Sequence, residues 1–587
     1  MNAGNSMVPR LPLVIALALA VAAGLALGVD GGSGFQAGKP ADLVFRNGDV
    51  YTVDAARTWA SAVAVAGNRI VYVGSDAGVE DWVGANTRVV DLGGRMLVPG
   101  FQDSHLHPSG QSLDMASLDN LVDAAEVLRT IQEYSEANPD RPWVIGRGWL
   151  EAAFKPSGVP TRQMLDEVVR DRPALMTNAS GHQGWANSKA LEIAGITVDT
   201  PDPPNGRIDH DASGEPSGIL QEAAQSLVRQ HIPPSTHEYR IDARRAALGE
   251  MARLGITAIV DASSSAASEA EFSELEDAGE LTVRAVSCQR YSPQRDDEEQ
   301  ILDFIARRKA LGDGQLRATC VKIGLDGIIE HHTASVLEPF VDRDDDYRGP
   351  MFVEPDRLRS VVTRLDAERF QVHIHAIADR SARQALNAIE EAQRVNGTGG
   401  GRHTLAHLQL LDPEDMPRLR MLGVTANMSP LWGRGDDWET VFAVRVLGAE
   451  RSQRLLQHDS IMGVGANLVW GTDWPVTSLI PVEGLETAIT RRYLGGVDPY
   501  GAPDQSWLPE ERVTLGDAIA SYTIRGAYLS FDEDERGSIE VGKLADLVVM
   551  EKNLFEILPL EIHEVAVDMT VFDGRVVFER QTSPTGD

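Results

Sequence analysis

The chain has 587 residues, enough for more than one domain, and its 43% hydrophobic and 24% charged residues argue against a mainly disordered protein. It carries 87 acidic residues against 54 basic residues, which gives a formal net charge of −33. Such an acidic protein is a poor partner for nucleic acid or an anionic membrane. We therefore expect a folded globular protein. A homo-oligomer is the default expectation, although no sequence feature assigns it.

The N-terminal region contains the apolar run "LPLVIALALAVAAGLALG" at 11–28, which follows Arg10 and carries no charge. This pattern is typical of an export signal. The run is about 18 residues long, near the lower limit for crossing a bilayer, so an uncleaved membrane anchor is the alternative. We expect a signal peptide or anchor at 1–29, a flexible glycine-rich spacer at 30–40, and export to the periplasm or the cell exterior.

Short alternating runs separated by turns predict a small antiparallel sheet between residues 41 and 97. Short alternating runs separated by turns also occur at the C-terminal end. Both ends together predict one composite β-sandwich domain, made of 41–97 plus 535–587. The hairpin signals are Asn47-Gly48, Gly67-Asn68 and Asp573-Gly574.

Between these ends, apolar strands alternate with helix-like segments such as "EYRIDARRAALGEMARLG", which is the rhythm of βα units. Eight strand candidates predict an α/β fold, a (β/α)8 TIM barrel over residues 98–534 with its active site at the carboxyl ends of the strands. The candidates are "RMLVPGFQDSHLH", "GITAIVDAS", "LTVRAVSC", "RATCVKIGLDG", "RFQVHIHAI", "RHTLAHLQL", "LGVTANMS" and "ANLVWGTDW".

A long connection, residues 108–239, separates the first two candidate strands. It exceeds what one helix needs, so we expect a functional insertion or subdomain. It contains a compact segment, "RPALMTNASGHQGWANSKALE", and a glycine-rich loop, "PNGRIDHDASGEPSG".

The chain has two cysteines, Cys288 and Cys320, and both lie in apolar runs. Two cysteines are too few for a disulfide framework or a thiolate metal site, so we expect both to be buried.

His105 and His107 stand two residues apart in the first barrel strand, "FQDSHLH". On a strand, this spacing directs both imidazoles to the same side, where they can chelate one ion. If no other residue is considered, two polar residues at a strand end explain the histidine pair equally well. The later strands favour the metal, because each of four ends with an ionisable residue: Lys322, His375, His407 and Asp473.

Burying that many ionisable groups around one axis would cost several kcal/mol each unless bound divalent cations compensated them. Imidazole and carboxylate ligands suit zinc, while iron, manganese and nickel are alternatives. Lys322 is an unusual member, since a protonated amine cannot bind a metal. Reaction with carbon dioxide would convert it to a carbamate whose oxygens could bridge two ions; a salt bridge to Asp326 is the alternative. His373 shares the face of His375 and could replace it as ligand, although we favour a core histidine.

With these residues in place, the sequence resembles the amidohydrolase superfamily, and within it the amidohydrolase family 3 branch, which includes N-substituted formamide deformylases and uncharacterised metal-dependent hydrolases. The resemblance rests on ordered motifs across nearly the whole chain: "VPGFQDSHLHP", "GHQGWANSKAL", "VKIGLDG", "HAIAD", "AHLQLL", "GTDWPV" and "RGSIEVGKLADLVVME". It implies a binuclear metal centre of two divalent ions, expected to be zinc. The implied ligands are His105, His107, a carboxylated Lys322, His375, His407 and Asp473.

The resemblance also implies the chemistry: a metal-activated hydroxide attacks the carbonyl of a small N-substituted amide or formamide, while Asp473 acts as general base and then acid. His182 matches a substrate-site histidine of the "GHxxWxNS" motif and is expected to assist catalysis. His331 or His332 could also hold the carbonyl. Trp185 and Trp432 could roof the site, or serve as local packing anchors.

Several positions depart from the family pattern, including Ser180, Ala378 and Ala406, and they bear on substrate specificity rather than hydrolysis. A deaminase or a lactone or ester hydrolase on the same barrel is the alternative function. The segment "HAIADRSARQ" lacks the glutamate that deaminases usually carry there. A non-catalytic exported binding protein is disfavoured, because all six metal-site residues are present.

Overall fold

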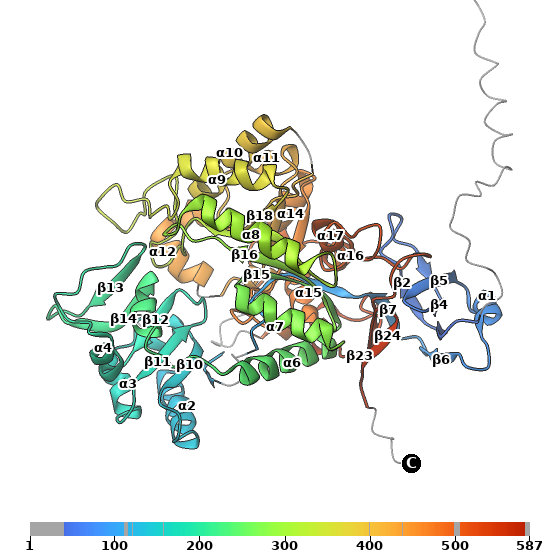
Figure 1. Cartoon of the computed structure of the whole chain (residues 1–587), viewed down its shortest axis with the longest axis horizontal. Coiled ribbons are helices and arrows are strands. Elements are labelled where there is room, and N and C mark those ends of the chain that lie inside the picture. The colour runs from blue at the N-terminus through green and yellow to red at the C-terminus, as the bar shows by residue number, and fades with distance from the viewer. Residues whose placement is uncertain are drawn as a thin grey trace, which may run out of the picture.

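The computed structural model describes residues 40–110, 115–119, 121–155, 158–397, 400–436, 438–497 and 505–581. The expected export signal or anchor and almost all of the spacer lie outside these residues. Among the helices within them, none is long and apolar enough to cross a membrane. Figure 1 shows a central barrel with a β-sandwich on one side and the inserted domain on the opposite side.

Eight parallel strands form the barrel, in the order in which they follow one another along the chain. An isolated parallel bridge between Leu106 and Trp474 joins the first strand to the segment after the last one. All eight predicted strands are present, so the predicted barrel is confirmed. They are β8 (Phe101–Leu106), β15 (Ile256–Ser264), β16 (Arg284–Arg290), β17 (Leu316–Gly324), β18 (Gln371–Ala376), β19 (Thr404–His407), β20 (Thr425–Met428) and β21 (Leu468–Trp470).

Amphipathic helices surround the strands. In α10, the buried residues Ala382, Leu386 and Ile389 recur at spacings of three and four, which places them on the face that packs against the barrel. The main covering helices are α6 (His237–Arg253), α7 (Ala266–Asp277), α8 (Asp297–Leu311), α9 (Pro355–Ala367), α10 (Asp379–Asn396), α15 (Pro481–Thr490), α16 (Leu515–Ser521) and α17 (Ile524–Leu529).

The sandwich draws on both ends of the chain, because β7 pairs antiparallel with β22. One sheet has the order β5-β4-β1-β6 and the other β24-β23-β22-β7-β2-β3. The strands are β1 (Leu43–Arg46), β2 (Asp49–Tyr51), β3 (Trp59–Ala60), β4 (Ala62–Ala66), β5 (Arg69–Gly74), β6 (Arg88–Asp91), β7 (Met96–Pro99), β22 (Leu547–Met550), β23 (Val567–Phe572) and β24 (Arg575–Glu579).

Two expectations for the sandwich were wrong. Its N-terminal part is not purely antiparallel, since β1 pairs parallel with β6 and β2 pairs parallel with β7. The Asn47-Gly48 turn closes no hairpin, because β1 and β2 lie in different sheets. The turn instead carries the chain from one layer to the other. The remaining two turn signals do connect antiparallel neighbours, β4 with β5 and β23 with β24.

The insertion forms a mixed six-stranded sheet in the order β13-β14-β12-β11-β10-β9. Its strands are β9 (Ala116–Ser117), β10 (Val144–Trp149), β11 (Ala174–Asn178), β12 (Gln183–Ala186), β13 (Gly206–His210) and β14 (Pro216–Glu222), with helices α2 (Ala124–Ala137), α3 (Arg162–Val168) and α4 (Ser188–Ala194). The glycine-rich segment at 204–218, predicted to be a loop, is the hairpin of β13 and β14.

Cys288 and Cys320 are fully buried, as expected, and they are also bonded to each other. They stand opposite each other on the neighbouring strands β16 and β17. Sequence reasoning missed this bond because pairing depends on the register of two strands. Disulfides of this kind persist mainly in oxidising compartments.

The disulfide predicts that the purified, denatured protein contains no free thiol when titrated with a thiol reagent. Reduction should destabilise the barrel by about 2–4 kcal/mol, because the cross-link restricts the unfolded chain. The unfolding temperature should fall with reductant in the wild type and stay constant in the double variant Cys288→Ala/Cys320→Ala. Two titratable thiols in the untreated protein would contradict the bond.

Candidate metal centre and pocket

The barrel closure brings the first and last strands together at their carboxyl ends. The Asp473 amide donates to the His105 carbonyl (2.7 Å), and the His107 amide donates to the Trp474 carbonyl (2.7 Å). The buried Asp103 carboxylate accepts the Thr472 hydroxyl (2.5 Å) and amide (3.1 Å). These bonds place "HLH" beside "TDW", although more than 360 residues separate Asp103 from Thr472 in sequence.

Gly471 permits this approach. A side chain there would collide with the Cβ atom of His105 and with the side-chain oxygen of Asn427. The next residues turn sharply, and Asp473 adopts a left-handed backbone with φ of 57°. Such strained non-glycine residues persist only where surrounding contacts hold them, and they concentrate at functional sites.

All six residues predicted as metal ligands come together around this closure. Asp473 Oδ1 lies 3.1 Å from His107 Nε2 and 3.5 Å from His105 Nε2. The remaining contacts connect Asp473 Oδ2 with His407 Nδ1 (4.0 Å), Lys322 Nζ with His105 Nε2 (3.3 Å), and the rings of His375 and His407, whose centroids lie 4.5 Å apart. His105, His407 and Asp473 each offer one ligand atom within 4.8 Å of the others.

Burial sets the charge of these groups. It lowers the pKa of His105, His375 and His407 well below the ordinary value, and the nearby Lys322 acts in the same direction for each. The imidazoles are therefore neutral and have lone pairs to offer a metal. Burial also lowers the pKa of Lys322 to about 7, which makes the unprotonated amine accessible near neutral pH.

The alternative salt bridge between Lys322 and Asp326 does not form among the described residues. Asp326 instead accepts the backbone amides of Ser335 (3.0 Å) and Ile377 (3.0 Å) and the hydroxyl of Ser381 (2.7 Å). It therefore ties the segment after β17 to the end of β18. Near it, His375 Nε2 donates to the Gly327 carbonyl (3.2 Å), which leaves Nδ1 with the lone pair.

His373 helps to hold His105, one of the proposed ligands, in position. Its Nε2 lies 2.9 Å from Nδ1 of His105, and the residue is fully buried. A metal on His105 Nε2 requires the proton on Nδ1, and His373 can accept that hydrogen bond. On its other side, a ring nitrogen of His373 and the two disulfide sulfurs lie within 4.8 Å of one another. Such partners of metal-binding histidines fix the tautomer and orient the ring.

The insertion reaches the barrel mouth through His182, whose ring centroid lies 5.7 Å from that of His375. His182 Nδ1 is 2.8 Å from Glu222 Oε2 at the end of β14, and the other Glu222 oxygen accepts the Thr333 hydroxyl (2.8 Å). Burial alone lowers the pKa of His182, but the Glu222 carboxylate outweighs it, so the net pKa is raised. Sequence reasoning missed Glu222, because only the folded hairpin brings it to His182.

A pocket opens beside these residues, and segments after most barrel strands contribute to it. Its polar lining includes two groups that sequence reasoning missed, Glu330 after β17 and Gln409 after β19. The Gln409 amide donates to the Glu330 carboxyl (3.4 Å). The lining residues are Ser180, His182, Ile328, Glu330, His375, Ile377, His407, Gln409, Trp432, Asp473 and Val476.

Of the four other residues expected at the substrate site, Trp432 lines the pocket, whereas Trp185, His331 and His332 are not among its lining residues. Trp432 lines the pocket and stacks on His407, with centroids 5.3 Å apart and planes 14° apart. Trp185 is fully buried in the core of the insertion, where its Nε1 donates to the Thr161 carbonyl (2.8 Å). It is therefore a packing anchor and not a wall of the pocket.

The adjacent residues His331 and His332 each contact an acidic side chain. His331 Nε2 lies 3.3 Å from Glu151 of the insertion, and His332 Nε2 lies 2.8 Å from Asp342. Neither is among the residues that line the pocket.

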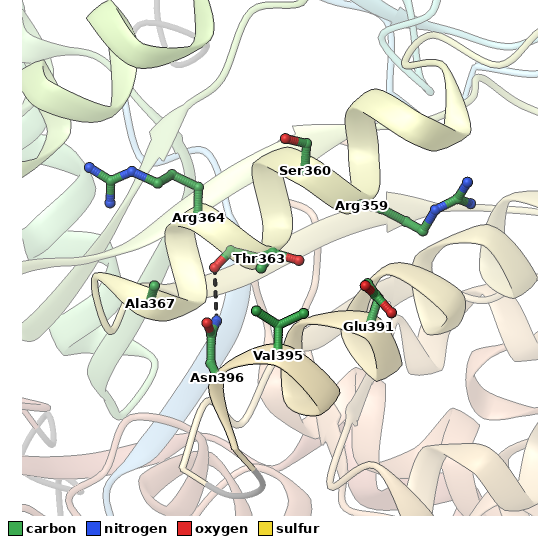
Figure 2. A pocket seen from close by; sticks show the side chains of 8 residues that line it. All are labelled: Arg359, Ser360, Thr363, Arg364, Ala367, Glu391, Val395 and Asn396. Carbon is green, nitrogen blue, oxygen red and sulfur yellow. Dashed lines mark hydrogen bonds between the residues drawn. The ribbon is translucent and has the colours of Figure 1, made fainter.

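A different hollow, between α9 and α10 on the outside of the barrel, is shown in Figure 2. Its residues come from the helices, so it has no part in this centre.

Comparison with known proteins agrees with this architecture. The model of the amidohydrolase family matches residues 88–578. The putative amidohydrolase YtcJ of Bacillus subtilis is 28% identical, over 92% of this chain and 99% of that protein. The N-substituted formamide deformylase of Arthrobacter pascens is 28% identical with the same coverage. An uncharacterized metal-dependent hydrolase from Pyrococcus furiosus has the same fold, with a TM-score of 0.65 at 23% identity over 88% of this chain and 99% of that one.

The closed parallel barrel, with these residues at the carboxyl ends of its strands, defines an α/β-barrel protein whose candidate site lies at the barrel mouth. More particularly, the chain belongs to the amidohydrolase family, and the predicted family is confirmed. It is a hydrolase of carbon–nitrogen bonds.

The contact between His373 and His105 predicts that His373→Leu weakens binding of a divalent ion about 10–100-fold, because His105 loses the partner that orients it. Competition with a chromogenic chelator measures this affinity. His373→Gln, which keeps an acceptor, should recover part of the loss, and the surface variant His237→Gln should match the wild type. Unchanged affinity in His373→Leu would remove His373 from the centre.

Proposed function

We propose that the protein hydrolyses small N-substituted amides or formamides at this centre. The observation that carries the proposal is the convergence of neutral imidazoles, Lys322 and Asp473 at the barrel mouth, beside a pocket that also receives His182 from the insertion. We assign to Asp473 and His182 the roles of moving and holding a proton there.

The donor set fits divalent ions. Buried neutral imidazoles and a carboxylate are the ligands that zinc accepts, and Lys322 with a lowered pKa has the free amine that carbamate formation needs. We assign His105, His107, carboxylated Lys322, His375, His407 and Asp473 as ligands of two ions, expected to be zinc. Bound ions supply Lewis acidity, which lowers the pKa of water and polarises a carbonyl.

The protein's own groups then complete the reaction. The Asp473 carboxylate lies at the pocket wall, where it can take a proton from the attacking water and pass it to the leaving amine. His182, held by Glu222, presents an imidazolium to the carbonyl oxygen and stabilises the negative charge that develops there. Both roles need the rigid positions that the closure and the insertion impose.

The walls of the pocket favour a hydrophobic substituent on the amide. Ile328, Ile377, Trp432 and Val476 provide apolar surface next to the polar groups. The resemblance to an N-substituted formamide deformylase supports the same substrate class. Formamides with alkyl or benzyl substituents are therefore the first substrates to test, with lactones and aminopurines as tests of the alternative reactions.

The proposal predicts about two divalent ions per chain after reconstitution with zinc and bicarbonate, measured by elemental analysis. Chelation should abolish hydrolysis of the amides, and zinc should restore it. Asp473→Asn should keep most of the metal but lower kcat about 100-fold or more, because the proton acceptor is lost.

Two results would count against this assignment. A reconstituted protein without bound metal would contradict the binuclear centre. Hydrolysis of lactones or aminopurines at rates far above those of every amide would replace the amide substrate class with one of the alternatives.

The ion pair predicts the pH dependence of Glu222→Gln. The Glu222 carboxylate raises the pKa of His182, so its loss lowers that pKa and the imidazolium is lost at lower pH. The basic limb of the kcat/KM profile should therefore move to lower pH. Glu215→Gln, an exposed change on the same hairpin, should leave the profile where it is. A Glu222→Gln profile identical to the wild type would exclude His182 as the group that titrates there.

A further inference from the structure

Glu330 has no role in the metal centre, yet it lines the pocket and is only 8% exposed. Within the described part of the chain, Gln409 is the one side-chain donor that reaches its carboxyl group, at Oε1 (3.4 Å). The second oxygen therefore has no donor from a described side chain. Its own backbone amide and His331 also favour the carboxylate form. A donor on a ligand in the pocket would add a hydrogen bond to the second oxygen.

Contacts on both sides hold Glu330 in place. It lies in the segment after β17, between Ile328, which packs in an apolar cluster with Ile377, and Thr333, which donates to Glu222. The neighbouring His331 contacts Glu151 of the insertion. Contacts with both the barrel and the insertion thus hold the carboxyl group at the pocket wall.

The wall combines one imidazole whose pKa Glu222 raises, that of His182, with two carboxylic acids. The residues that line the pocket include the carboxylic acids Glu330 and Asp473 but neither an arginine nor a lysine. A substrate with its own carboxylate would find no guanidinium or ammonium group among these residues and would face Glu330. A substrate with an N–H or ammonium group would complete the hydrogen bonding of Glu330.

We propose that Glu330 is a specificity-determining residue that selects amides carrying a second, hydrogen-bond-donating nitrogen and discriminates against amides carrying a carboxylate. The inference rests on the proposed amide hydrolysis and narrows its substrate class. The donor nitrogen contacts Glu330, and the hydrocarbon between it and the scissile amide lies along the apolar walls.

Burial raises the pKa of Glu330 to about 7, although its own backbone amide, His331 and the Gln409 amide act in the opposite direction. A substrate ammonium would favour the carboxylate form and gain a charge-assisted hydrogen bond. Discrimination by a buried polar group is typically strong, because the wrong substrate leaves that group unpaired or repelled.

Three formamides of equal chain length test the inference: an N-alkylformamide and its counterparts with a terminal amine and a terminal carboxylate. We expect the amine to be preferred to the alkyl compound about tenfold or more in kcat/KM, and the carboxylate to be the poorest substrate. In Glu330→Gln the amine-to-alkyl ratio should fall about tenfold, while the relative rate of the carboxylate rises. Glu330→Asp, which keeps the charge, should retain part of the preference for the amine.

Glu338→Gln is the matched control, because Glu338 is an exposed residue of the same segment. It should leave all three rates unchanged. Thermal unfolding of each variant establishes that it folds. Dissociation constants of the same compounds for the zinc-loaded proteins, measured by calorimetry, provide a readout that is independent of turnover, and the wild-type preference for the amine should weaken in Glu330→Gln.

The outcomes separate the two proposals. If the wild type hydrolyses the alkylformamide but Glu330→Gln changes all three substrates by the same factor, the role of Glu330 is wrong and amide hydrolysis stands. If the wild type hydrolyses none of the three, the proposed function is wrong, and the binding ratios then decide whether Glu330 selects a donor nitrogen. Equal ratios in the wild type and Glu330→Gln would overturn that selection.

Discussion

The closure of the barrel between β8 and β21 is the constraint on which the rest of the site depends. Asp473 can meet His105 and His107 only if the last strand returns to the first one, and the Asp103–Thr472 hydrogen bonds hold that junction. The arrangement tolerates no side chain at Gly471, since His105 occupies that space. The chemistry at the mouth is thus a direct consequence of how the sheet closes.

Below the mouth, a continuous set of contacts connects the barrel interior to the proposed metal ligands. The disulfide lies beside His373, and His373 contacts His105. Cys320 and Lys322 are two residues apart on β17, so both face the interior and the bond lies directly below the lysine. The disulfide therefore joins β16 to β17 close to Lys322, the lysine proposed as a ligand.

The repeating patterns of the chain made the barrel predictable. Short apolar strands alternating with amphipathic helices identify the eight strands, and the polar residue that ends several of them identifies the candidate ligands. Both signals are local. Glu222 and Glu330 could not be found in this way, because only the folded insertion and the packed segment after β17 bring them to the pocket. Trp185 and Trp432 look alike in sequence, and tertiary packing alone makes one a core residue and the other a pocket wall.

The insertion connects His182 with the segment after β17 that carries Glu330. One carboxylate, Glu222, contacts His182 with one oxygen and Thr333 with the other. It therefore orients the proposed oxyanion partner and also fixes the segment that carries Glu330. Because the insertion contributes none of the six proposed ligands, changes within it can alter the pocket while the centre stays intact. Glu222 thereby fixes His182 of the insertion relative to the segment after β17 that carries Glu330.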